Sequence, residues 1–358
     1  MIDMKEKKDF LHLFTYLITG GILLAGFIFC VDPFYHYHRS WFGLPTVMEN
    51  AVYQTPGAIR HFSYDSAILG TSMTENFHAS WFEEMGWETV KLSYSGARTD
   101  DLKALLELIY SRAESPAHIV IDLNTYQLTV PANTFFADRP EYLYDNSILT
   151  DVSYLYNFDV VLESLKRVAD GIRGIESNLD DAYTWEDEFY FGKSQVFDSV
   201  RESKQQLLRE GTQTVDLEAM LLCCDENLDN ILPFIEAHPE TRFYFFYPPY
   251  SVLYWEQEIL KGDLEEILTV FAHSIQRLLA YENVSVYYFQ DELEVISNLD
   301  NYRDANHHRP EYNRYIYECI RDGKKLVTEE NLRECIETVY QYVIDFDYDA
   351  LWEEDTAQ

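Results

Sequence analysis

Two short segments, far apart in the chain, carry residue types that could together transfer an acyl group. Gly70-Thr71-Ser72 follows an apolar run, and Asp304-Ala305-Asn306-His307 lies near the C-terminal end. A serine hydroxyl is a weak nucleophile until a base takes its proton, and imidazole has a pKa suited to that task. A carboxylate orients the imidazole ring and stabilises its cation. The two segments therefore contain the nucleophile, the base and the carboxylate that a serine hydrolase needs.

Each segment also has an ordinary structural interpretation. Ser72-Met73-Thr74-Glu75 matches a capping box, in which the serine only caps the start of a helix. An aspartate and a histidine in a surface loop are mostly just solvated, and the adjacent His307 and His308 could instead contact a metal. Neither segment is decisive alone.

Short apolar runs separated by helical patterns predict the scaffold that positions these segments. The runs are residues 67–69, 90–92, 118–123, 242–247 and 284–289. Strands that alternate with amphipathic stretches, such as 100–109 and 262–279, are typical of a parallel sheet with helices on both faces. We expect an α/β fold, a three-layer sandwich with a five-stranded parallel sheet. Ligands of such sheets bind beyond the carboxyl ends of the strands, where Ser72 lies.

The N-terminal segment predicts a membrane anchor. Residues 10–31 have no formally charged side chain, and a helix of that length can cross a hydrocarbon core of about 30 Å. Lys5, Lys7 and Lys8 precede the run and only Arg39 follows closely, so the positive-inside rule places the N-terminus in the cytoplasm and the remainder outside the cell. A cleaved signal peptide is the alternative, but the run is long and no clear Ala-x-Ala site follows it.

The rest of the chain divides by pattern. The segment between 123 and 242 is too long for a simple crossover, so we expect a helical insertion beside the sheet. The expected parts are a cytoplasmic N-terminus 1–9, a transmembrane helix 10–31, a membrane-proximal neck 32–60, a globular domain 61–345 with the insertion at about 131–240, and an acidic tail 346–358.

Composition excludes some partners. The chain has 358 residues, of which 27 are basic and 62 acidic, giving a net charge of −35. A phosphate backbone would be repelled, so we expect no nucleic-acid partner. The five cysteines have no zinc-site spacing, and we expect neither a metal nor a cofactor.

The chemistry-bearing residues resemble the sequence blocks of the SGNH (GDSL-like) hydrolase superfamily, which has a flavodoxin-like fold. Gly70-Thr71-Ser72 after the first strand, Gly96 after the second and Asp304-x-x-His307 carry the resemblance. The anchor, Asp32-Pro33-Phe34 and the stretch 68–77 further resemble a membrane-anchored SGNH-like group of bacterial surface proteins. The resemblance implies that Ser72 is the nucleophile, that His307 rather than His308 is the base, and that Asp304 orients the base.

The resemblance also implies an oxyanion hole. Two of its donors would be the backbone N–H groups of Ser72 and Gly96. The family's third donor is an asparagine in a Gly-x-Asn block. Asn124 follows the third strand without that glycine and is the candidate in this chain.

The function implied is that of a membrane-anchored extracellular serine esterase or O-acyltransferase. Its substrates would be ester-linked acyl groups of cell-wall or surface polysaccharide. Related anchored proteins are associated with polysaccharide O-acetylation and teichoic-acid D-alanylation, often beside an integral-membrane O-acyltransferase, which is an expected partner. The alternative is a non-catalytic SGNH-like domain that binds polysaccharide or scaffolds a membrane acylation complex.

Overall fold

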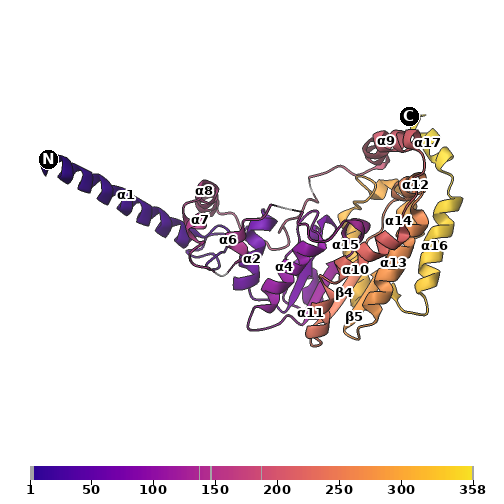
Figure 1. The fold of residues 1–358 in the computed structure, drawn as a ribbon, viewed down its shortest axis with the longest axis horizontal. Coiled ribbons are helices and arrows are strands. Elements are labelled where there is room, and N and C mark those ends of the chain that lie inside the picture. Colours follow the sequence, from indigo (N-terminus) through magenta and orange to yellow (C-terminus); the bar gives the residue numbers. More distant parts are fainter. Residues whose placement is uncertain (1–3, 137, 146, 187, 357–358) are drawn as a thin grey trace. The chain divides into compact units, whose positions relative to one another are not determined.

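The computed structural model describes residues 4–136, 138–145, 147–186 and 188–356, which fold into two compact units (Figure 1). The first unit comprises Met1–Phe62 with Arg139–Leu179, and the second comprises Ser63–Asp138 with Asp180–Gln358. The unit boundaries differ from the expected parts. Residues 139–179, expected as part of the insertion, belong to the unit that contains the N-terminal helix.

The second unit is built on a six-stranded sheet. Its strands are β1 Ser66–Leu69, β2 Thr89–Lys91, β3 His118–Asp122, β4 Arg242–Tyr247, β5 Val284–Tyr288 and β6 Leu326–Val327. They lie in the order β2-β1-β3-β4-β5-β6, with β1 to β5 parallel and β6 antiparallel to β5. The α/β class is confirmed, but the expected five-stranded parallel sheet is wrong, because the sheet is mixed. β6 has two residues, too few to produce an alternating pattern in the sequence.

Helices of the second unit cover both faces of the sheet (Figure 1). They are α3 Ser72–Glu75, η1 Ala79–Met85, α4 Thr99–Tyr110, α5 Thr125–Thr129, α9 Lys193–Glu210, α10 Leu217–Leu228, α11 Leu232–Ala237, α12 Val252–Lys261, α13 Leu264–Leu279, α14 Leu293–Ser297, η2 Leu299–Asn301, α15 Pro310–Asp322, α16 Leu332–Asp345 and α17 Tyr348–Thr356. The stretches 100–109 and 262–279, expected as helices, lie largely within α4 and α13.

Strand residues alternate between two buried layers. Ile68 and Phe246 pack with Ile316 of α15 in one cluster. Tyr247 points to the other face, where its ring lies 5.3 Å from that of Phe271 in α13. The sheet is therefore the middle of three layers. Because β1 to β5 are parallel, their carboxyl ends lie along the same edge of the sheet.

The first unit contains α1 Met4–Val31, α2 Ala51–His61, α6 Glu141–Tyr144, α7 Val152–Leu155 and α8 Phe158–Arg173. One helix in the described part of the chain, Lys5–Val31, is long and apolar enough to cross a membrane, and it lies near the N-terminus. The neck after it is organised by Asp32, whose carboxylate accepts the backbone N–H groups of His36, Tyr37 and His38 at 2.7–3.0 Å. Its Oδ1 also accepts the Tyr154 hydroxyl at 2.6 Å.

Candidate active site

A tight turn at the end of β1 presents Ser72. Gly70 has a φ of 136°, a region that side-chain-bearing residues rarely adopt. The buried carboxylate of Asp122, at the end of β3, accepts the backbone N–H of Thr71 at 2.7 Å and its hydroxyl at 2.8 Å. Burial raises the pKa of Asp122, although these hydrogen bonds oppose the shift. The neighbouring strand therefore fixes the conformation of the serine turn.

We predict that Gly70→Ala strongly destabilises the second unit. The new Cβ would overlap the Asp122 carboxylate and would require a strained backbone. The expected loss is about 3 kcal/mol or more. Gly86→Ala is the matched control, since Gly86 has a φ of 77° but open space around its Cα, and it should cost only about 1–2 kcal/mol. Thermal unfolding measures both, and equal losses would contradict the role of Asp122.

Ser72 is not the cap of its helix. Thr71 is the N-cap residue of α3, and its hydroxyl accepts the backbone N–H of Met73 at 3.3 Å. The side chain of Glu75, expected to complete a capping box, instead accepts a hydrogen bond from Ser95 at 2.8 Å. The capping interpretation of Ser72 is therefore wrong, and its hydroxyl is available for other contacts.

The structure brings Ser72, His307 and Asp304 together, although 235 residues separate the serine from the histidine. The Ser72 Oγ lies 2.8 Å from His307 Nε2. On the other side of the ring, His307 Nδ1 lies 2.9 Å from Asp304 Oδ1 and 2.8 Å from Oδ2. The geometry is that of a nucleophile, a base and an orienting carboxylate in hydrogen-bonded series.

The Asp304 carboxylate is held in place from several directions. Its Oδ1 accepts the backbone N–H groups of Asn306 and His307, both at 2.9 Å. Burial alone would raise the pKa of Asp304, but the hydrogen bonds and charge of His307 outweigh it and hold that pKa well below its usual range. Asp304 is therefore an anion at neutral pH, as an imidazolium partner requires.

His308 lies elsewhere. Its ring is 1% exposed, its Nδ1 lies 3.0 Å from the Arg309 carbonyl oxygen, and burial lowers its pKa to about 4. A histidine in this environment remains neutral and does not meet Ser72. Within the residues that the structure describes, no group of three His, Cys, Asp or Glu side chains is arranged to hold a metal ion.

The two backbone N–H groups expected as oxyanion donors lie in the turns after β1 and β2. The N–H of Ser72 is in the first turn of α3 and has no acceptor within the helix. Gly96, with a φ of 72°, lies in the turn after β2. That turn is joined to the serine segment by two hydrogen bonds, from Tyr94 N–H to the Gly70 carbonyl oxygen at 3.2 Å and from Ser95 to Glu75.

Asn124 is placed differently from the expected third donor. Its amide nitrogen donates to Asp122 Oδ2 at 3.1 Å and to the Thr71 hydroxyl at 3.5 Å. Its Oδ1 caps α5 by accepting the Gln127 N–H at 3.0 Å. The side chain thus supports the carboxylate that fixes the serine turn. The Gly-x-Asn glycine that this chain lacks was the sequence signal of this difference.

We predict that Asn124→Ala reduces stability more than catalysis. Loss of the cap and of a donor to buried Asp122 should cost about 1–3 kcal/mol, while kcat towards a small ester should change only a few-fold. Asn50→Ala, which removes a helix cap in the first unit, is the control for cap loss. A fall in kcat of about 10²–10³ would show instead that the amide acts as an oxyanion donor.

Trp185 and Arg303 were not expected at the site. The Trp185 indole N–H donates to the Ser72 carbonyl oxygen at 3.1 Å, and its ring meets the His307 ring edge-on at 5.7 Å. The Arg303 guanidinium lies 4.5 Å from the Trp185 ring, and its Nε donates to Asp304 Oδ2 at 3.2 Å. Sequence patterns gave no signal for Trp185, because it lies in the expected insertion among acidic residues with no periodic apolar pattern.

The side chain of Lys91 stabilises the serine segment through buried hydrogen bonds. It is 2% exposed, and its ammonium group donates to the carbonyl oxygens of Glu75 at 2.7 Å and Asp180 at 2.9 Å. Burial lowers the pKa of Lys91 to about 7, although the charges of nearby carboxylates act to raise it. The lysine joins the end of α3 to the segment that leads to Trp185.

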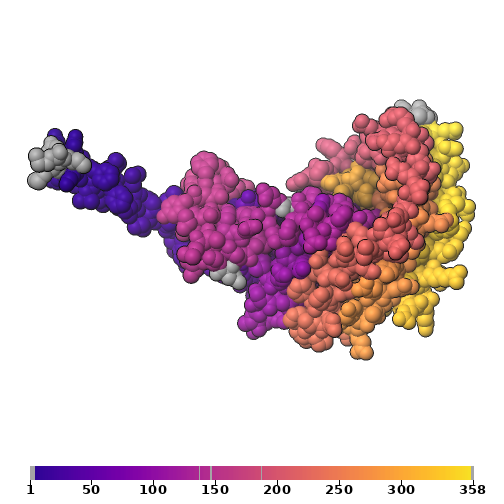
Figure 2. Space-filling view, viewed as in Figure 1, coloured from indigo at the N-terminus to yellow at the C-terminus, as the bar shows by residue number. Residues whose placement is uncertain are grey.

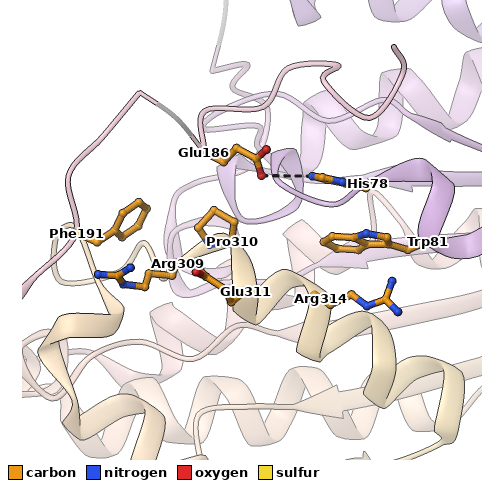
Figure 3. Close-up of a pocket in the computed structure, with 8 residues that line it drawn as sticks. All are labelled: His78, Trp81, Glu186, Phe191, Arg309, Pro310, Glu311 and Arg314. Carbon is orange, nitrogen blue, oxygen red and sulfur yellow. Dashed lines mark hydrogen bonds and ion pairs between the residues drawn. The ribbon is translucent and has the colours of Figure 1, made fainter.

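A pocket of about 420 Å³ is lined by segments that flank the triad (Figure 3). Its lining residues are His78, Trp81, Glu186, Phe191, Arg309, Pro310, Glu311 and Arg314. Glu186 follows Trp185, and Arg309 is two residues from His307. The His78 ring stacks on Trp81 at 4.5 Å, with Glu186 3.3 Å from His78 Nε2. Aromatic faces and charges of both signs therefore surround one cavity.

No family model matches this sequence, and no curated protein is similar to it. The functional assignment therefore depends on the geometry of the site.

Proposed function

We propose that this protein is a membrane-anchored serine esterase or O-acyltransferase of the SGNH type. The observation that carries the proposal is the continuous hydrogen-bonded series from Ser72 Oγ through His307 to the Asp304 carboxylate. These groups come from opposite ends of the chain and meet beyond the strand ends of a largely parallel sheet. If Ser72 were only a helix cap and Asp304 and His307 only parts of a solvated loop, nothing would require these three side chains to meet.

The reaction follows from the order of the groups. His307 Nε2 takes the proton of Ser72 as Oγ attacks an ester carbonyl, and the backbone N–H groups of Ser72 and Gly96 hold the oxyanion. As the carbon–oxygen bond of the ester breaks, His307 gives the proton to the departing alkoxide oxygen, so that the alcohol leaves and the acyl group stays on Ser72. A water or polymer hydroxyl, deprotonated by His307, attacks the acyl group and restores the serine. Water as acceptor gives an esterase, and a polymer hydroxyl gives an acyltransferase.

Polysaccharide of the cell wall or surface is the proposed substrate. The pocket, whose lining includes Arg309 two residues after His307, combines the indole of Trp81 with arginine and glutamate side chains (Figure 3). Aromatic faces suit the apolar side of a sugar ring, and charged side chains suit its hydroxyl groups. With α1 as an anchor and the N-terminus in the cytoplasm, the second unit lies outside the cell, within reach of such polymers and of an integral-membrane O-acyltransferase partner.

A fluorophosphonate probe tests the proposed nucleophile. Such probes phosphonylate serines that are activated by a base. We expect stoichiometric labelling of the purified chain at Ser72, with none in Ser72→Ala and little in His307→Ala. Ser63→Ala, at an exposed position of the same unit, should label normally. A folded wild-type protein that stays unlabelled would falsify the enzyme proposal.

The polymer proposal is tested separately. Replacing the native copy with Ser72→Ala should change the ester-linked acyl content of the cell surface, measured after mild alkaline release. A labelled enzyme with an unchanged surface content would keep the esterase chemistry and reject the polymer substrate.

The second candidate is a non-catalytic domain that binds polysaccharide or scaffolds an acylation complex. The engagement of the Asn124 amide with Asp122 favours it, because that amide is then turned to a structural contact rather than to the role of the family's third oxyanion donor. This candidate predicts polysaccharide binding that is unchanged in Ser72→Ala, together with no probe labelling.

A further inference from the structure

Helix α8 in the first unit exposes its apolar side. Phe158, Leu162, Leu165 and Ile172, here called the apolar stripe, are 72%, 47%, 54% and 83% exposed. Their spacing of four, three and seven residues puts them on one face of the helix. Such a face normally lies against a protein core.

The opposite side of α8 is buried, and its buried residues other than Val160 are polar. Arg167 is 2% exposed, donates to the Val47 carbonyl oxygen at 3.2 Å and lies 3.6 Å from the Asp170 carboxylate. Gly171 packs closely against Leu44, whose Cδ2 lies 3.0 Å from where a Cβ would stand. These contacts with Val47 and Leu44 of the neck hold α8 with its apolar stripe outward. If α8 turned about its own axis to cover the apolar stripe, the polar side would lose these contacts.

Helix α8 and the residues just before it pack against the membrane-spanning candidate. Ile28 of α1 packs in one cluster with Tyr154 of α7 and Val160 of α8. The Tyr156 hydroxyl donates to the Gly21 carbonyl oxygen at 3.3 Å. Gly21 is ten residues before the end of α1, which corresponds to about 15 Å along the helix axis. In a spanning α1, that level is inside the hydrocarbon rather than above it.

Three further apolar side chains of the same segment are also exposed. Ile148, Leu149 and Val152 are 83%, 88% and 60% exposed. Figure 2 shows residues of the 147–175 segment gathered beside the end of α1. An accumulation of exposed apolar side chains in one short segment marks an interaction with lipid or with a protein.

We propose that the segment 147–175 is embedded in the outer leaflet of the membrane, with the apolar stripe against lipid acyl chains. Lipid is favoured over a protein partner because α8 packs against α1, and because Tyr156, two residues before the stripe begins, contacts α1 at a level within its apolar length. The segment thus turns a single anchor into a broader membrane contact. This inference depends on α1 spanning the membrane and is independent of the chemistry at Ser72.

Cysteine accessibility in lipid alone tests the proposal. The full chain is reconstituted in phosphatidylcholine nanodiscs with single substitutions Leu162→Cys or Leu165→Cys, and a water-soluble maleimide is followed by peptide-resolved mass spectrometry. A thiolate does not form readily in hydrocarbon, so modification should be at least about tenfold slower than in Leu222→Cys. Leu222, 61% exposed in α10 of the second unit, is the matched aqueous control.

Two further positions calibrate the result. Leu17→Cys in α1 should be as protected as Leu162→Cys, and Lys166→Cys, at the border of the polar side, should react readily. Modification of Leu162→Cys at the rate of Leu222→Cys overturns the proposal. Protection that appears only when a membrane protein partner is added also overturns it, and assigns the stripe to that partner.

Discussion

Ser72→Ala is expected to abolish ester hydrolysis by this chain. The Oγ that lies 2.8 Å from His307 Nε2 is the proposed attacking atom, and no other group in the series can form the acyl intermediate. In serine hydrolases, loss of the nucleophile lowers kcat by about 10³–10⁶. Release of product from a small chromogenic acetyl ester, with the full chain in detergent, measures the loss.

His307→Ala and the double variant complete this prediction. Residues that act as a unit are not additive, so His307→Ala and the double variant should both fall to the level of Ser72→Ala. Stability should change little in Ser72→Ala, because Thr71 rather than Ser72 caps α3. Residual activity above a tenth of wild type in the folded single variant would exclude the acyl-serine mechanism.

The sequence was most informative where periodicity and local chemistry agreed. The five expected strand runs each coincide with a strand of the sheet, because buried parallel strands are continuous apolar runs bounded by turn residues. Asp304-x-x-His307 placed the carboxylate and the imidazole within one turn of each other, so a local pattern was enough to suggest their contact. The contact of His307 with Ser72 is different, since only the fold brings these ends together.

Tertiary contacts explain what the sequence did not predict. The role of Asn124 depends on whether its amide turns towards the oxyanion or towards Asp122, and both are compatible with its position after β3. Trp185 reaches the site from a segment with no periodic pattern. The apolar stripe of α8 was not distinguishable from an ordinary core-facing helix, since the sequence shows an amphipathic pattern but not which side is covered.

The order of the C-terminal segment also depends on tertiary contacts. Its acidic composition left its order undetermined, but α17 forms and packs Trp352 against Phe197 of α9 with ring centroids 4.7 Å apart. The Trp352 indole N–H also donates to the Glu256 carboxylate at 2.9 Å. One aromatic side chain therefore anchors a segment whose acidic composition does not predict whether it is ordered.

Asp304→Asn is expected to preserve the fold and to lower kcat by about 10³–10⁴. The asparagine Oδ1 can still accept the backbone N–H groups of Asn306 and His307, so the loop should keep its conformation. The amide nitrogen would take the place of Oδ2, which now faces His307 Nδ1 and accepts from Arg303. An amide N–H facing Nδ1 favours the tautomer in which His307 accepts at Nδ1 and carries its proton on Nε2, and this tautomer cannot take a proton from Ser72.

The stability of Asp304→Asn distinguishes an effect on the tautomer of His307 from a loss of structure in the loop. Because the folded pKa of Asp304 is depressed, its ionisation stabilises the fold above the ordinary aspartate pKa of about 3.9, and this contribution is lost as pH falls through the folded value. The variant should therefore be somewhat less stable than wild type at pH 7 and nearly equal to it in strong acid. Asp300→Asn, an exposed aspartate that accepts the Lys193 N–H, is the matched control and should retain activity. A variant that keeps wild-type kcat at pH 7 would show that Asp304 only shapes the loop, because the tautomer of His307 would then not depend on the carboxylate.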